Sequence, residues 1–144
     1  MIAQALLFLI LYSQPVVVDS DIQFRFNGRV SNADGSPVSG VEVFFTDTHL
    51  EENHKARIRN VSLGDTNEEG KFRASYRYNW SRSYPSIKAP EEGHFTLVFR
   101  RSGYRRATLK VEIRSLACSE GACVVPFDFV LRRETTGKNG GPAR

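Results

Sequence analysis

The sequence predicts an all-β fold, a seven-stranded antiparallel sandwich with Greek-key connections. Apolar side chains recur at every second position in several separate runs, which is the spacing that turns one face of a strand toward a core. Clusters of Asp, Asn, Gly and Pro separate these runs and are typical of turns. No segment carries the apolar period of a long amphipathic helix, so strands are expected to supply the core.

The first run shows the alternation most clearly. Ile22, Phe24 and Phe26 lie on one face of the expected strand, and Arg25 and Asn27 lie on the other. Six later runs repeat the pattern, and their apolar faces together would form one core. The seven strands are expected at residues 22–30, 41–45, 61–63, 72–78, 95–99, 109–113 and 127–131.

Two segments outside these strands are ambiguous or polar. Residues 48–58 fit one or two helical turns, because Thr48 and Glu51 have the spacing of a capping box and Glu51 precedes Lys55 by four positions. A polar loop between two strands is the alternative for this segment. Residues 135–144 contain three glycines and one proline and are expected to be disordered, because they offer little apolar surface to bury.

Three motifs occur in a fixed order along the chain. Residues 28–43 read G-x-V-x-x-x-x-G-x-P-V-x-G-V-x-V, residues 65–72 read D-T-x-x-x-G-x-F, and residues 102–105 read Ser-Gly-Tyr-Arg. On these motifs the chain resembles the carboxypeptidase regulatory-like domain, a transthyretin-like (prealbumin-like) sandwich related to the Cna-B fold. The resemblance covers residues 22–133. It implies a prealbumin-like topology and a non-catalytic role, because such domains usually accompany other activities.

The 144 residues suit one domain, expected at residues 21–134, behind an export signal at residues 1–20. Residues 5–12 form an apolar run that is too short to span a bilayer, and Pro15 and small residues follow it. Cleavage is expected after Ser20. A buried first strand is the alternative. The export signal predicts a secreted, periplasmic or extracellular location, without a transmembrane anchor.

Cys118 and Cys123 are the only cysteines. In an oxidising compartment they would close a small loop between the last two strands, and loop-closure entropy would stabilise the fold by about 2 kcal/mol. A metal site is the alternative, but it needs two further ligands that the neighbouring residues do not offer.

The sequence predicts no catalytic residue, no metal site and no cofactor, and hence no enzyme. An H-x-x-E motif at His49 and Glu52 resembles the zinc ligands of carboxypeptidases, but a third ligand and a catalytic domain are missing. Intradiol dioxygenases are built on a similar sandwich and bind iron through paired tyrosines and an H-x-H element. This chain has no H-x-H, although phenolates could come from Tyr76, Tyr78, Tyr84 and Tyr104.

Two features predict binding instead, and both have simpler explanations. The loop after residue 79 carries the only tryptophan, whose ring could stack on a sugar or cover one end of the core. Arginine pairs follow the expected fifth strand and favour polyanions, although a net charge of +4 also fits an ordinary solvated surface. The candidate ligand-binding residues are Trp80, Arg82, Tyr84, Arg100, Arg101, Arg105 and Arg106.

The expected function is therefore that of an exported binding or structural accessory module. Its partner is expected to be a protein or an extracellular glycan or polyanion, and no specific nucleic acid, because no nucleic-acid recognition motif accompanies the basic residues. Asn60 and Asn79 begin glycosylation sequons, which matter only if the chain passes through a eukaryotic secretory route.

Overall fold

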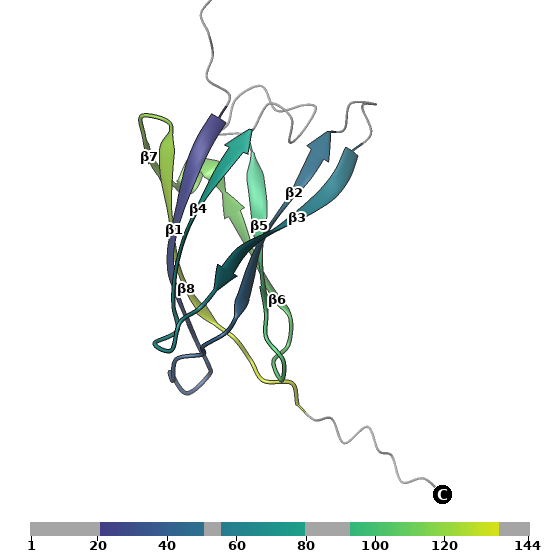
Figure 1. Ribbon diagram of the computed structural model, residues 1–144, viewed down its shortest axis with the longest axis vertical. Coiled ribbons are helices and arrows are strands. Elements are labelled where there is room, and N and C mark those ends of the chain that lie inside the picture. Colours follow the sequence, from purple (N-terminus) through teal and green to yellow (C-terminus); the bar gives the residue numbers. More distant parts are fainter. Residues whose placement is uncertain (1–20, 51–55, 80–92, 136–144) are drawn as a thin grey trace, which may run out of the picture.

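The computed structural model describes residues 21–50, 56–79 and 93–135, and it forms a β-sandwich of two four-stranded sheets (Figure 1). This confirms the all-β sandwich that the sequence predicts. No helix in the described part of the chain is long and apolar enough to cross a membrane. The strands are β1 (Asp21–Ser31), β2 (Glu42–Leu50), β3 (Ala56–Asp65), β4 (Lys71–Asn79), β5 (His94–Arg100), β6 (Ala107–Glu112), β7 (Ala117–Ser119) and β8 (Ala122–Val130).

Sheet A has the strand order β4-β1-β8-β7, and sheet B has the order β3-β2-β5-β6. Neighbouring strands are antiparallel except β1 and β8, which pair in parallel from Gln23 opposite Ala122 to Ser31 opposite Val130. The prediction of a purely antiparallel sandwich is therefore wrong at this pair. Side-chain alternation has the same period in both kinds of pairing, so the sequence pattern could not distinguish them.

The boundaries differ from the prediction in four places, one of which is β8, predicted at residues 127–131 but observed from Ala122 to Val130. The eighth strand is β7, whose three residues are too few to show an alternating pattern. Ile113 leaves β6 and begins a short 3-10 helix, η3 (Ile113–Ser115). Strands β2 and β3 extend through residues 48–50 and 56–58, so the helix considered for residues 48–58 does not form there, and residues 51–55 lie outside the described part.

The core between the sheets is centred on Phe24, Phe45 and Phe95. The Phe45 and Phe95 ring centroids are 4.7 Å apart, those of Phe24 and Phe95 are 4.8 Å apart, and all three side chains are buried. Each comes from the apolar face predicted for its strand, so the alternation identified the inward residues correctly. Such aromatic contacts stabilise the core beyond simple burial of area.

The first two sequence motifs meet at one buried hydroxyl. Thr66 Oγ1 donates to the Val38 carbonyl at 2.7 Å and accepts from the Val41 N–H at 3.0 Å, which ties the β1–β2 connection to the β3–β4 turn. Gly70 has a φ of +71°, and a Cβ at this position would overlap the Val30 carbonyl oxygen. Both motifs therefore have a structural role, the fixing of one end of the sandwich.

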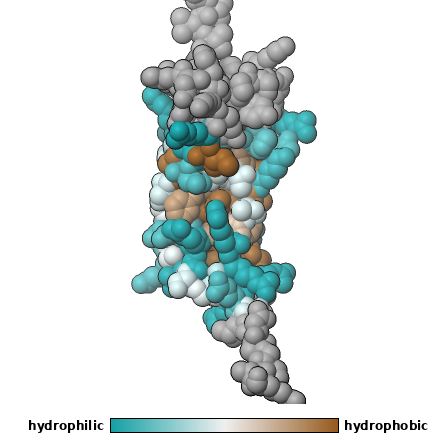
Figure 2. All heavy atoms as spheres, turned by 90° about the vertical axis from the view of Figure 1, so that its right-hand side faces the viewer, coloured by the Kyte–Doolittle hydropathy of each residue, from teal (hydrophilic) through white to brown (hydrophobic). Residues whose placement is uncertain are grey.

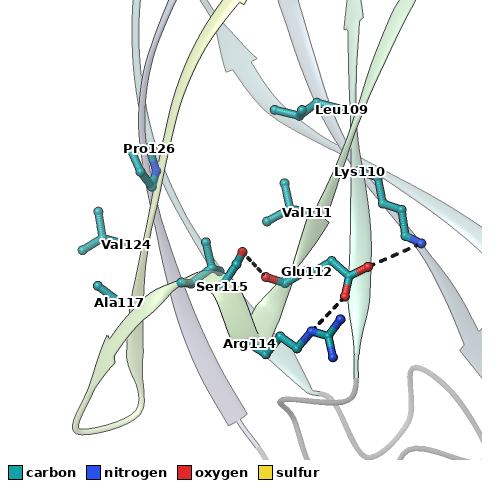
Figure 3. Close-up of a pocket in the computed structure, with 10 residues that line it drawn as sticks. Leu109, Lys110, Val111, Glu112, Arg114, Ser115, Ala117, Val124 and Pro126 are labelled. Carbon is teal, nitrogen blue, oxygen red and sulfur yellow. Dashed lines mark hydrogen bonds and ion pairs between the residues drawn. The ribbon is translucent and has the colours of Figure 1, made fainter.

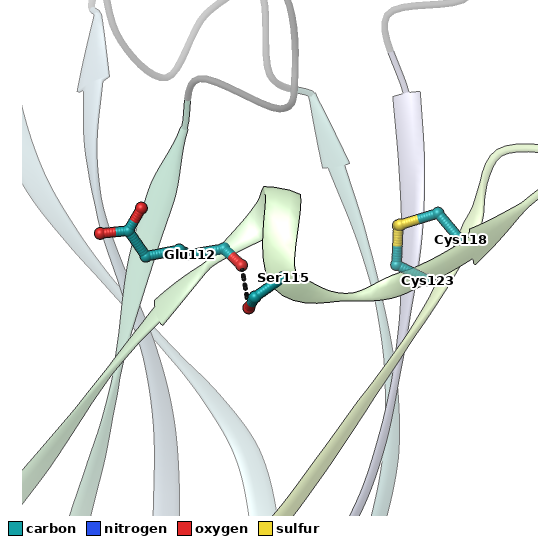
Figure 4. Close-up of a disulfide and its surroundings, with 4 residues drawn as sticks. All are labelled: Glu112, Ser115, Cys118 and Cys123. Carbon is teal, nitrogen blue, oxygen red and sulfur yellow. Dashed lines mark hydrogen bonds between the residues drawn. A yellow bond between two sulfur atoms is a disulfide. The ribbon is translucent and has the colours of Figure 1, made fainter.

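The predicted disulfide between Cys118 and Cys123 is present, with a Sγ–Sγ distance of 1.99 Å (Figure 4). The two cysteines are directly opposite each other in the β7–β8 hairpin. Glu120 and Gly121 form the turn with φ values of +52° and +76°, the two positive values that a type I′ turn requires. The bond therefore closes a two-residue hairpin, and it links sheet A only to itself.

Replacing both cysteines by serine should lower the free energy of unfolding by about 2 kcal/mol, because the closed loop is short and loop-closure entropy rises only with the logarithm of its length. Urea unfolding of the oxidised wild type, the reduced wild type and the double variant measures the loss. The reduced wild type should lose the same amount or slightly less, because Cys123 is buried and a serine there also places a hydroxyl in the core. A reduced protein that is as stable as the oxidised one would contradict this account.

Candidate functional site

Arginines gather at the end of the sandwich where the β1–β2 and β5–β6 connections lie, at the bottom of Figure 1. The chain also leaves β8 at this end, so that a third segment joins the two connections. We call this region the arginine end. Its members come from residues 100–106 and from the two positions after Leu131, and they are Arg100, Arg101, Arg105, Arg106, Arg132 and Arg133.

Backbone hydrogen bonds bring the β5–β6 connection against the segment that follows β8. The Arg105 N–H donates to the Arg132 carbonyl at 2.8 Å, and the Glu134 N–H donates to the Gly103 carbonyl at 3.0 Å. Tyr104 and Arg133 form an antiparallel bridge between the two segments. These backbone contacts hold the two segments side by side, although they are far apart in the sequence. They therefore fix the positions of the Cα atoms from which the arginine side chains extend.

A cleft of about 540 Å³ opens at this junction, lined by Asn32, Ala33, Asp34, Arg105, Arg132, Arg133 and Thr135. Arg105 Nη2 donates to Thr135 Oγ1 at 2.8 Å, and the Arg133 guanidinium lies 5.8 Å from the centre of the Tyr104 ring. These contacts hold two of the three guanidinium groups in place. The third arginine, Arg132, is exposed.

Asp34 is the one carboxylate among the residues that line the cleft. Hydrogen bonds from the side chain and the backbone of Ser36 lower the pKa of this carboxyl, and the charge of Arg133 lowers it further. Asp34 Oδ1 accepts the Ser36 N–H at 2.9 Å, so this oxygen is engaged in its own turn. The cleft therefore presents three guanidinium groups and one ionised carboxylate, an excess of positive charge.

The structure separates the arginines that the sequence grouped together. Arg100 binds Glu42 at 2.7 Å and lies 4.9 Å from the centre of the Phe44 ring, on the outer face of sheet B. The Arg101 guanidinium lies against Gly40. Arg106 is exposed and is not among the residues of the cleft. Of the five arginines predicted for ligand binding, only Arg105 is among the residues that line the cleft. Arg82 lies outside the described part, as do the other two predicted loop residues, Trp80 and Tyr84.

Sequence reasoning missed Arg132 and Arg133. They follow directly after the last predicted strand, where their only signal is that two arginines are adjacent. Nothing in the sequence showed that this segment pairs with the β5–β6 connection. The cleft therefore became apparent only from the fold.

A second group of ionisable side chains lies toward the opposite end of the sandwich, at Asp47, Arg59 and Tyr76. Arg59 donates from Nε and Nη2 to the two Asp47 carboxylate oxygens, each at 3.3 Å. The Asp47 side chain is 1% exposed and that of Arg59 is 35% exposed, so the carboxylate depends on its partner far more than the guanidinium does. The Arg59 guanidinium lies 5.9 Å from the centre of the Tyr76 ring.

Burial raises the pKa of Tyr76, and the nearby Asp47 charge adds to the increase, whereas Arg59 opposes it. Because the folded pKa lies above the unfolded one, this contribution to stability is complete below pH 10 and is lost as the pH rises through the folded pKa. The ultraviolet titration of wild type minus that of Tyr76→Phe should therefore have its midpoint above pH 10. A midpoint at or below pH 10 would contradict the burial described here.

The tyrosines of the described chain do not fit the iron site of an intradiol dioxygenase. Tyr78 is 1% exposed and packs against the rings of Phe24 and Phe45, while Tyr76 lies beside a guanidinium that would repel a cation. Tyr104 lies at the arginine end, far from both in the fold. No group of three or more His, Cys, Asp or Glu residues able to hold a metal occurs within residues 21–50, 56–79 and 93–135.

The H-x-x-E motif can be placed only in part. Position 49 lies in β2, but the side chain of His49, like Glu52, is outside what the structure describes. The sequon residue Asn60 is exposed on β3, and its Oδ1 accepts a hydrogen bond from Thr46 Oγ1 at 2.6 Å. The side chain of Asn79, which begins the second sequon, lies outside the described part.

An apolar groove of about 650 Å³ opens between β6 and the β7–β8 hairpin (Figure 3). Glu112 lies at its rim and is paired with Lys110 at 3.7 Å and with Arg114 at 3.3 Å. The charges at the rim thus satisfy one another and point to no ligand. The apolar side chains that line the groove are Leu109, Val111, Leu116, Ala117, Val124 and Pro126.

The described surface on the right-hand side of Figure 1 is largely hydrophilic around a smaller apolar area (Figure 2). Within the described residues, the large apolar side chains that are most exposed are Ile58, Val124 and Val130. They belong to β3 and β8, which are not neighbours in either sheet. Exposed apolar residues therefore do not mark a site as clearly as the arginine end does.

No protein-family model matches the chain, and a search of the curated proteins found no similar sequence. Solved structures are similar to it. A chlorocatechol 1,2-dioxygenase from Pseudomonas putida has a TM-score of 0.54 at 13% identity, over 83% of this chain and 64% of that chain. A catechol 1,2-dioxygenase from Acinetobacter sp. ADP1 has a TM-score of 0.51 at 13% identity, over 83% of this chain and 55% of that chain.

A third similar structure is the dioxygenase domain of a dioxygenase carbohydrate-binding protein fusion from Streptomyces sp. SirexAA-E. Its TM-score is 0.50 at 18% identity, over 83% of this chain and 85% of that chain. The chain thus spans less than two thirds of the first two enzymes and most of this domain. At these identities the likeness shows a shared fold and does not extend to activity.

These comparisons contradict the expectation that the chain is not an enzyme. That expectation came from a resemblance to a largely non-catalytic family, whereas the three similar structures described above are dioxygenases. A sandwich of this kind is therefore no ground for assigning a non-catalytic role. The described tyrosines do not match the iron site of an intradiol dioxygenase, but this mismatch concerns that one site and does not bear on other reactions.

Proposed function

We propose that this chain binds an anionic ligand in the cleft at the arginine end. The observation that carries the proposal is the convergence of Arg105, Arg132 and Arg133, from two segments far apart in the sequence, on one concave surface. Guanidinium groups bind carboxylate, sulfate and phosphate groups through paired N–H donors, and they remain charged at every physiological pH.

The geometry favours a ligand that carries hydroxyl groups beside its negative charge. Asn32, the ionised Asp34 and Thr135 line the cleft with hydrogen-bonding side chains. Asn32 Oδ1 and Asp34 Oδ1 already accept N–H groups of their own turn, which leaves the Asn32 amide group, the second Asp34 oxygen and the Thr135 hydroxyl to face the hydroxyl groups of a ligand. An acidic sugar offers this combination of an anionic group and hydroxyl donors. We therefore assign an acidic carbohydrate as the ligand class of the cleft.

The test measures binding of a heparin tetrasaccharide by titration calorimetry at low salt. Arg105→Ala combined with Arg133→Ala should weaken binding at least about tenfold, because two charge-assisted contacts are lost. Lys110→Ala combined with Arg114→Ala removes the same charge outside the cleft and should change affinity by less than about threefold. Equal losses in the two double variants would show general charge attraction and would overturn the proposal.

We also propose that the chain is exported and that it belongs with the carboxypeptidase regulatory-like domains of prealbumin-like, Greek-key topology, as its motifs imply. The disulfide supports export, because such bonds persist in oxidising compartments. Mass spectrometry of the secreted product tests the location. A product that begins after Ser20 and carries the disulfide is expected, whereas an intracellular product with Met1 and free thiols would contradict export.

A further inference from the structure

The outer face of sheet A carries a row of five cationic side chains on its two neighbouring strands β1 and β4. All five are exposed, and they alternate with buried or half-buried residues of the same strands. We call this set the cationic row. It consists of Arg25, Arg29, Lys71, Arg73 and Arg77.

The register of β1 and β4 arranges these charges in a zigzag. Arg77 is opposite Gln23, Arg25 is opposite Ser75, and Arg73 is opposite Asn27. In each of these three pairs, one arginine lies across from one neutral hydrogen-bonding side chain. From one pair to the next, the arginine alternates between β4 and β1. Residues two positions apart in a strand are separated by about 6.8 Å, so the row extends over about 20 Å.

The row ends at a pair of like charges. Arg29 is directly opposite Lys71, and like charges in this arrangement destabilise a sheet. Lys71 has an acidic partner in Glu69, at 2.9 Å. Across the described residues, no ion pair within 4.0 Å includes any of the four arginines of the row. Their guanidinium donors are therefore available to a ligand.

From this arrangement we propose that the cationic row is a docking surface for an extended acidic polysaccharide, separate from the cleft at the arginine end. A flat row of spaced charges suits a linear polyanion, and it does not suit a compact ligand, which would need a concave site. The neutral side chains between the charges, Gln23, Asn27 and Ser75, can bond to hydroxyl groups along the same chain.

The composition of the face favours a glycan over a single-stranded nucleic acid. Single-stranded nucleic acids bind where aromatic side chains stack on successive bases. The outward residues of β1 and β4 include no aromatic side chain, and those of β8 include Val124, Pro126, Asp128 and Val130. The face thus offers positive charges and hydrogen-bonding groups but no aromatic rings on which bases could stack. These groups match the negative charges and hydroxyl groups of a sulfated or carboxylated sugar chain.

The inference does not rest on the proposed function of the cleft, because the two surfaces share no residue. The probe is a long heparin fragment of at least twelve sugars, labelled for fluorescence anisotropy and titrated at several salt concentrations. Arg25→Ala combined with Arg73→Ala should weaken binding at least about tenfold, and it should reduce the slope of log affinity against log salt by about two.

Three comparisons make the test decisive. The charge-matched control is Lys110→Ala with Arg114→Ala, and it should weaken binding by less than about threefold. Arg25→Lys with Arg73→Lys keeps the charge and should retain most of the affinity. Arg105→Ala with Arg133→Ala should spare more of the long-fragment affinity than the row variant does, although it weakens the tetrasaccharide in the cleft.

Each result has a defined meaning. Equal losses in the row variant and the charge-matched control would overturn the inference, and so would tighter binding of a 25-nucleotide poly(dT) than of the heparin fragment. If the row variant binds the fragment normally while the cleft variant loses the tetrasaccharide, the cleft proposal stands and the row inference fails. The reverse pattern would support the row and overturn the cleft.

Discussion

Phe45→Ala should lower the free energy of unfolding by about 4 kcal/mol, the largest loss expected from a single substitution in this chain. The Phe45 ring is fully buried at the centre of the core. Its centroid lies 4.7 Å from that of Phe95 on β5, and 4.7 Å and 5.4 Å from those of Tyr76 and Tyr78 on β4. Its removal would leave a cavity in contact with both sheets, which neighbouring rings cannot fill without leaving their own contacts.

The adjacent Phe44 provides the control. It is half-buried on the outer face of sheet B, where it contacts the Arg100 guanidinium at 4.9 Å. Phe44→Ala should therefore cost no more than about 1–2 kcal/mol. Denaturant unfolding of both variants measures the difference. Equal losses would mean that the alternation of β2 is not oriented as described.

Arg59→Met should lower the free energy of unfolding by about 3 kcal/mol at neutral pH, because it leaves the Asp47 carboxylate buried without its partner. Asp47→Ala should cost less, since the remaining Arg59 guanidinium is partly exposed and can reach water. The loss therefore depends on which partner is removed. Methionine keeps much of the apolar stem of the arginine, so lost packing contributes little to the change.

A double variant and a surface pair complete this test. Asp47→Leu combined with Arg59→Met should be more stable than Arg59→Met alone, because no charge is left buried. The exposed pair of Glu42 and Arg100, at 2.7 Å on the same sheet, should lose less than about 1 kcal/mol when Glu42 becomes alanine. If Arg59→Met costs no more than the Glu42 variant, the carboxylate is not buried as described.

The sequence pattern was sufficient to predict the sandwich because the core is formed by apolar residues at every second position of the strands. Phe24, Phe45 and Phe95 each lie at the apolar positions of a period of two, and each is buried. The pairing of Cys118 with Cys123 could also be predicted, because the chain contains no other cysteine. Local composition was enough for these features.

The pattern was not sufficient where residues distant in the sequence meet. Nothing local shows that β1 pairs with β8 in parallel, or that Arg132 and Arg133 come beside Arg105. Alternation in the first strand places Arg25 on the outward face, but the zigzag of the cationic row depends on the register of β1 and β4, which alternation alone does not specify. Function was predicted least well, because one sandwich supports both binding domains and enzymes.

The most direct test of the anion-binding cleft is a nuclear magnetic resonance titration with the heparin tetrasaccharide, observing the arginine Nε–Hε signals. The structure predicts that the signals of Arg105, Arg132 and Arg133 shift together and saturate with one affinity, while that of Arg114, outside the cleft, remains in place. Shifts spread evenly over all surface arginines, or absent from these three, would contradict the account.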